Sequence, residues 1–132
     1  MTDHNHTGPT RFVLVIGAMK AGTTSLFEYL STHPAVARSQ PKEPDFFSDP
    51  HRWASGTNSA ERLVTYRAFW DWDPDTHKVA LEASTSYTKL PAHSGVPERV
   101  KSLGNHEFRF IYVMRDPVRR MVSHLTHLAT RR

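Results

Sequence analysis

The 132-residue chain has no cysteine, which excludes disulfide bonds, thiolate metal sites and cysteine nucleophiles. No apolar run approaches the roughly 18 residues that a membrane span needs. The first ten residues, "MTDHNHTGPT", lack the apolar core of a signal peptide. From these absences we expect a soluble, cytoplasmic protein with no membrane span.

A strong excess of one charge is absent too. Seventeen Lys and Arg residues stand against 13 Asp and Glu, a net charge of +4, and the basic residues are dispersed rather than arranged in a stripe. This balance suits an anionic small ligand, and we expect no nucleic-acid partner. Among the nine histidines, His124 and His127 could share a helix face, but no third ligand accompanies them, so we expect no metal site.

Alternating strand and helix patterns predict an α/β fold with a parallel sheet. The length suits one domain, which we expect over residues 11–132 after a flexible tail at residues 1–10. Residues 50–60 are polar and expected to be mobile. We expect strands at residues 11–17, 77–84 and 108–114, a fourth near Val36, and helices at residues 24–32, 59–70, 96–104 and from Pro117 onward.

The loops after Gly17, Glu82 and Met114 each follow a predicted strand. Because ligands of open parallel sheets bind beyond the carboxyl ends of the strands, these loops should gather at one ligand-binding edge. A sheet of three or four strands usually needs more covering elements than this pattern supplies. We therefore expect the N-terminal portion of a larger domain, truncated after the last helix with its C-terminal part missing.

The segment "VIGAMKAGTTSL" joins the first predicted strand to the first predicted helix. Gly17 and Gly22 have the spacing of a Walker A loop, in which glycines let backbone amides close around a phosphate. Here Lys20 lies inside the loop, and threonines follow Gly22 where that motif has lysine. The amides from Ala21 to Ser25 should point at an anion from the start of a helix.

A P-loop nucleotide kinase is one alternative for such a loop. Its Mg²⁺–nucleotide chemistry calls for an acidic residue at a strand end, but the strand "FIYVMRDP" presents Arg115 first. An ordinary strand–helix turn with an exposed lysine is another alternative.

Several motifs resemble those of sulfotransferases that use 3′-phosphoadenosine 5′-phosphosulfate (PAPS). "GAMKAGTTSL" is similar to the family's 5′-phosphosulfate loop, and "YVMRDPVRRMVSH" to its 3′-phosphate motif, with Arg115 at a strand end and Ser123 eight residues later. "KEPDFF" and "LEASTSYTKLP" look like segments of the bacterial and carbohydrate-type branches. The resemblance spans residues 12 to about 128 and implies a P-loop-type α/β fold that needs no metal.

The resemblance also assigns roles to residues. Lys20 would stabilise the leaving phosphate and Glu43 would be the general base, with Glu82 as its competitor for that role. Glu82, Ser84 and Tyr87 would contact a small-molecule or carbohydrate acceptor, although Ala83 stands where the carbohydrate branch often has lysine. The donor PAPS would be bound by Lys20, Ala21, Gly22, Thr23, Thr24, Ser25, Arg115 and Ser123.

The sequence thus predicts an enzyme that transfers a sulfuryl group from PAPS to a hydroxyl or amine. The alternatives are the P-loop nucleotide kinase and a non-catalytic remnant that binds the desulfonated nucleotide or nothing. Because a C-terminal part is expected to be missing, we expect weak turnover or none from the 132 residues alone.

Overall fold

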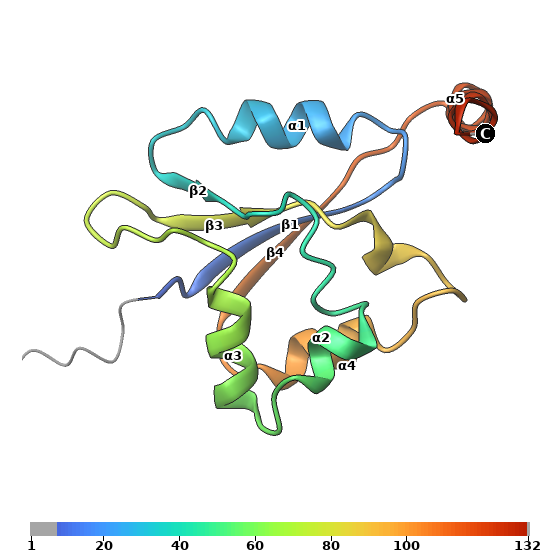
Figure 1. Ribbon diagram of the computed structural model, residues 1–132. Coiled ribbons are helices and arrows are strands. Elements are labelled where there is room, and N and C mark those ends of the chain that lie inside the picture. Colours follow the sequence, from blue (N-terminus) through green and yellow to red (C-terminus); the bar gives the residue numbers. More distant parts are fainter. Residues whose placement is uncertain (1–7, 132) are drawn as a thin grey trace, which may run out of the picture.

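The sheet is built from four short strands whose neighbouring pairs are all parallel (Figure 1). The computed structural model describes residues 8–131. In the central strand β1, Phe12 lies opposite Ala80 on one side and Phe108 on the other. The order along the sheet is β2-β3-β1-β4, which confirms the predicted α/β fold. The strands are β1 (Arg11–Gly17), β2 (Val36–Arg38), β3 (Val79–Glu82) and β4 (Glu107–Tyr112).

Helices cover both faces of this sheet (Figure 1). One face carries α1, and the other carries α2, α3 and α4. A 3₁₀ turn, η2, follows β3, while α5 lies beyond the end of the sheet and apart from the other helices. The bounds are α1 (Thr23–Leu30), α2 (Pro50–Ala54), α3 (Ser59–Arg67), η2 (Thr85–Thr88), α4 (Val96–Ser102) and α5 (Pro117–Thr130).

Side-chain caps fix where three of the helices begin. The side chains of Asp49, Asn58 and Asp116 accept hydrogen bonds from first-turn backbone amides of α2, α3 and α5 respectively. Such caps satisfy amides that have no partner within the helix. Residues 50–60 are therefore more regular than the mobile loop expected from their polarity, because they contain α2 and the start of α3.

Both faces of the sheet are buried along β1 and β3, as covered parallel strands require, whereas the edge strand β4 has no fully buried residue. Toward α1, Val15 and Leu81 pack with Phe27. On the other face, Phe12 and Tyr66 belong to a larger aromatic core, with ring centroids 5.1 Å apart. The other buried members of this core are Leu14, Ala37, Phe46, Phe47, Trp70, Ala80, Tyr87, Val96, Val100 and Leu103.

The two ends of the described chain differ in how they pack. Residues 1–7 of the predicted tail lie outside the described residues, but Pro9 is buried and its carbonyl accepts a hydrogen bond from Arg67 Nε at 2.9 Å. At the other end, apolar side chains of α5, such as Met121 and Leu125, are more than half exposed. Within residues 8–131, no helix is long and apolar enough to cross a membrane.

Phe12→Ala should lower the free energy of unfolding by about 3–5 kcal/mol, because it empties the centre of the aromatic core. Urea denaturation measures this change. Val64→Ala is the control, since Val64 lies on α3 with its side chain exposed, and a change within about 0.5 kcal/mol is expected. Equal losses for both variants would show that Phe12 is not central to the core.

Candidate functional site

The ends of β1, β3 and β4 meet at one edge of the sheet. The backbone of Val113 exchanges two hydrogen bonds with Gly17 and Ala18, of 2.7 and 2.9 Å. The Thr88 hydroxyl donates to the carbonyl of Ile16 at 2.7 Å. The loop after β1 is thereby held against the segments that follow β3 and β4, as the sequence predicted for a ligand-binding edge.

The glycine loop between β1 and α1 has a backbone suited to an anion. Gly22 occupies the cap position of α1 with φ of 89°, and no side chain caps the helix. A Cβ at Gly22 would meet no atom within 4 Å, so the left-handed backbone itself is what favours glycine there. The uncapped amides at the start of α1 are the kind of donors that bind anionic groups.

A cavity of about 510 Å³ lies in front of this loop, and we call it the loop cavity. Arg115 Nη1 donates to the Lys20 carbonyl at 3.2 Å, which brings the two predicted anion-binding motifs together. Ala21, in the loop, and Ser25, in the first turn of α1, do not line the cavity. The predicted site residues that do line it are Lys20, Gly22, Thr23, Thr24, Glu43, Arg115 and Ser123.

The loop cavity is cationic. Lys20, Lys42, Arg115 and Arg131 line it, against the single carboxylate of Glu43. Lys42 Nζ donates to Thr24 Oγ1 at 2.7 Å. Lys42 was not among the residues expected at the site, although its position directly before Glu43 in "KEPDFF" was a signal for it.

His124 and His127 also line the loop cavity, so the helix face that they share borders this cavity. The charge of Lys20 is the main cause of a lowered pKa at His127, followed by burial and by the charges of Arg131 and His124. Among residues 8–131, no group of three or more His, Asp or Glu side chains is placed to hold a metal ion.

Glu43 is held by the segment that follows β3. Its Oε1 accepts hydrogen bonds from the Thr85 backbone amide at 3.2 Å and from Thr85 Oγ1 at 3.1 Å. Thr85 lines the loop cavity and also a second cavity beside it. A carboxylate in this place can accept a proton from a group bound at the junction of the two cavities.

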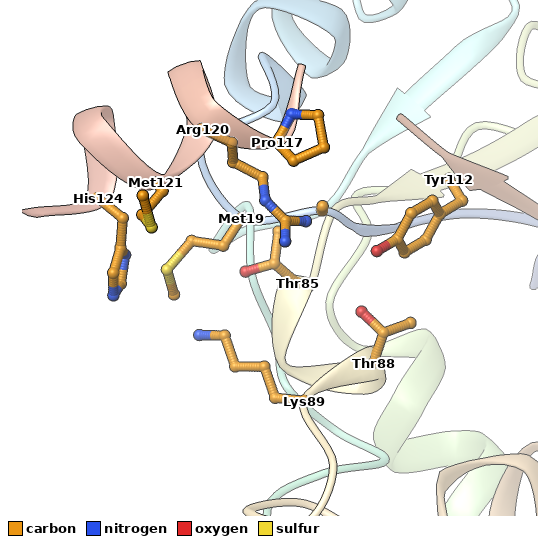
Figure 2. A pocket seen from close by; sticks show the side chains of 10 residues that line it. Met19, Thr85, Thr88, Lys89, Tyr112, Pro117, Arg120, Met121 and His124 are labelled. Atoms are coloured by element: carbon orange, nitrogen blue, oxygen red, sulfur yellow. The ribbon is translucent and has the colours of Figure 1, made fainter. Parts of the chain in front are cut away.

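The second cavity, the adjoining cavity, has a volume of about 500 Å³. It shares Met19, Thr85 and His124 with the loop cavity. Figure 2 shows Lys89 and Arg120 extending into the space between α5 and the segment after β3, with His124 beside them. Its lining includes no Asp or Glu, so it too favours an anionic ligand.

Glu82 lies beneath the cavities instead of at their surface. It is fully buried, and its carboxylate accepts hydrogen bonds from Tyr66 at 2.6 Å, Ser84 at 2.8 Å and Tyr87 at 3.0 Å. Glu82, Ser84 and Tyr87, which the sequence analysis expected at the acceptor, line neither cavity. Burial raises the pKa of Glu82 to about 7 in spite of these three donors.

The sequence profile of the sulfotransferase domain matches residues 10–130. The chain belongs to the sulfotransferase family. Its glycine loop, with Lys20 inside and Thr23 after the second glycine, departs from the Walker A pattern G-x-x-x-x-G-K-[ST].

Curated relatives of this sulfotransferase domain include two from mouse (Mus musculus). Heparan sulfate glucosamine 3-O-sulfotransferase 5 is 26% identical over 87% of the chain and 30% of its own length. Heparan sulfate glucosamine 3-O-sulfotransferase 3A1 is 31% identical over 90% of the chain and 27% of its own length. Membrane-associated sulfotransferase kil1 of Dictyostelium discoideum is 32% identical over 83% of the chain and 21% of its own length. The chain thus spans less than a third of the length of each of these relatives.

The buried Glu82 should make stability depend on pH. Its pKa is about 7 when folded and near 4.5 when unfolded, so the folded state binds more protons between these values. Stability from this group is therefore full below about pH 4.5 and is lost as pH rises through 7, by up to roughly 3 kcal/mol. Glu82→Gln cannot titrate, so its unfolding free energy should rise relative to the parent's over that window.

Urea denaturation of both chains at several pH values between 4.5 and 8 measures this difference. Using the difference cancels the contributions of histidines and of the other carboxylates. A difference that stays constant with pH would show that Glu82 does not titrate in this range.

Proposed function

We propose that this domain transfers a sulfuryl group from PAPS to a hydroxyl or amine of a carbohydrate acceptor. The observation that carries the proposal is the loop cavity, which places the glycine loop, Arg115 and Ser123 around one space with Glu43 at its border. Family membership and the relatives' names support the reaction class.

The donor set fits PAPS, which carries two separate anionic groups. The amides at the start of α1, with Lys20 and the hydroxyls of Thr23 and Thr24, would hold the 5′-phosphosulfate. Arg115 and Ser123 would hold the 3′-phosphate through charge-assisted hydrogen bonds. Arg120, in the first turns of α5, lines the adjoining cavity and not the loop cavity.

Lys20 and Glu43 would have complementary tasks in the transfer. PAPS supplies a sulfuryl group on a phosphate leaving group. Lys20 stabilises the negative charge that develops on that phosphate. Glu43, oriented by Thr85, takes the proton from the acceptor hydroxyl or amine.

The adjoining cavity would take the acceptor, because Thr85 joins it to the loop cavity beside Glu43. Lys89, Arg120 and His124 favour an acceptor that carries negative groups near the reacting one. Heparan sulfate, named in several relatives, is an acceptor class with this property.

Titration calorimetry with 3′-phosphoadenosine 5′-phosphate should show binding without magnesium, and ATP should bind more weakly. Arg115→Ala should weaken this ligand by about 2–3 kcal/mol, as expected for a lost charged partner. The same variant should leave adenosine 5′-phosphosulfate, which has no 3′-phosphate, almost unaffected.

Arg119→Ala is the matched control, because Arg119 lies in the first turn of α5, shortly after Arg115 in sequence, and lines neither cavity. Tight binding of ATP that requires Mg²⁺ would favour a kinase. Equal losses for the two nucleotides in Arg115→Ala would assign that arginine a purely structural part.

Glu43→Gln keeps the shape of the side chain and removes the base. We expect kcat for sulfuryl transfer to a heparan sulfate oligosaccharide to fall about 10²–10⁴-fold, measured in a longer natural chain if the 132 residues alone give no turnover. The dissociation constant of 3′-phosphoadenosine 5′-phosphate should stay within about twofold, because the donor's anion-binding groups remain. Near-normal turnover in this variant would exclude Glu43 as the base. Donor binding without any transfer, in the longer natural chain as well, would support a non-catalytic nucleotide-binding domain.

A further inference from the structure

Glu82 is the only buried charged side chain among residues 8–131. Hydroxyl groups, and no cation, satisfy its carboxylate. A buried charge without a cationic partner is costly, and the proposed reaction gives it no direct contact with donor or acceptor. Its hydrogen bonds therefore need an explanation of their own.

The Ser84 hydroxyl connects Glu82 to the segment that carries Glu43. Ser84 Oγ donates to Glu82 Oε2 at 2.8 Å and accepts the backbone amide of Asp45 at 3.1 Å. A serine hydroxyl has one proton and two acceptor lone pairs. Because the Ser84 hydroxyl donates its hydrogen bond to the carboxylate, a lone pair of its oxygen is oriented to accept from the Asp45 amide.

The backbone is tied on both sides of Glu43. Before it, the Lys42 carbonyl accepts the Ala83 amide at 3.0 Å. After it, the Asp45 amide reaches Ser84. Between these two ties, the Glu43 carboxylate meets Thr85, so its place depends on the register of the two segments.

We propose that Glu82 is a positioning residue, which through the Ser84 hydroxyl fixes the backbone of residues 43–45 and so holds the Glu43 carboxylate beside Thr85. The catalytic value of this arrangement rests on the proposed function, in which Glu43 accepts the proton. The chain of hydrogen bonds from Glu82 to Asp45 does not depend on that function.

Within the described residues, the hydrogen-bonded path from the Glu82 carboxylate to the Asp45 backbone amide runs through the Ser84 hydroxyl. The groups that face Glu82 are Tyr66 from α3, Tyr87 from η2 and the acidic Asp45. Protonation puts a donor on the carboxyl group, so the Ser84 hydroxyl can turn and its contact with the Asp45 amide changes. Burial, which raises the pKa of Glu82 to about 7, puts this change near neutral pH.

Amide NMR spectra of the 132-residue chain between pH 5.5 and 8.5 test the relay. The Asp45 amide resonance should shift with an inflection near pH 7 in the parent, and Glu82→Gln and Ser84→Ala should each abolish the inflection. Hydrogen exchange at the Asp45 amide should accelerate about fivefold to tenfold in Ser84→Ala, as expected for one lost hydrogen bond. Adding Glu82→Gln to Ser84→Ala should accelerate it no further.

Tyr66→Phe is the matched control, because it removes a donor to Glu82 from the opposite side and leaves Ser84 in place. It should keep the Asp45 inflection. An inflection that persists in Glu82→Gln, or additive effects in the double variant, would overturn the proposal. If Glu82→Gln does not fold, loss of the inflection in Ser84→Ala together with its retention in Tyr66→Phe still supports the proposal, and the reverse pattern overturns it.

A catalytic measurement separates this proposal from the proposed function. In the 132-residue chain, or in a longer natural chain if that one gives no turnover, Glu82→Gln and Ser84→Ala should lower kcat by similar factors of about tenfold, with the affinity for 3′-phosphoadenosine 5′-phosphate unchanged within about twofold. A loss of donor affinity equal to the loss of kcat would show a general structural role and would overturn the positioning role. If the parent chain neither binds this nucleotide nor transfers sulfate, the proposed function fails while the Asp45 measurements still decide the relay.

Discussion

The two backbone hydrogen bonds between Val113 and the pair Gly17–Ala18 hold the start of the glycine loop against the chain that leaves β4. They form where β1 and β4 have both ended their regular pairing, and they bring Arg115 within hydrogen-bonding distance of the Lys20 carbonyl. Two motifs almost a hundred residues apart in sequence therefore share one cavity because two neighbouring parallel strands end at the same edge of the sheet.

Each strand of the sheet delivers a different part of the site. The segment after β1 provides Lys20, the one after β2 provides Glu43, the one after β3 provides Thr85, and the one after β4 provides Arg115. Rigid strands set the separation of these groups, while the loops give each group its direction. This arrangement suits transfer chemistry, in which placement and charge stabilisation supply much of the rate.

The fold could be predicted from the sequence because its apolar runs and helix signals agree with the parallel sheet that forms. The sequence could also bring the glycine loop and Arg115 to the same edge of the sheet, because both directly follow predicted parallel strands, and the structure places Arg115 against the Lys20 carbonyl. It could not place Glu82, because a carboxylate at a strand end has the same sequence pattern whether it faces a ligand or lies buried. Only the packing of Tyr66 and Tyr87, from two other elements, decides that Glu82 is buried. Lys42 and Thr85 were missed for a similar reason, since their contacts join separate segments.

Of the helices that contribute to the site, α5 is the one with no buried residue. It carries Ser123, His124 and His127. Its start is fixed by the Asp116 cap, but its apolar side chains pack little against the described part of the chain. The glycine loop, by contrast, is anchored at both ends by β1 and α1. A ligand that touched both the loop and α5 would lose part of its binding free energy to ordering the helix. Arg115, which precedes the helix and is already bonded to the loop, reduces that cost because it fixes one end of α5 before any ligand binds.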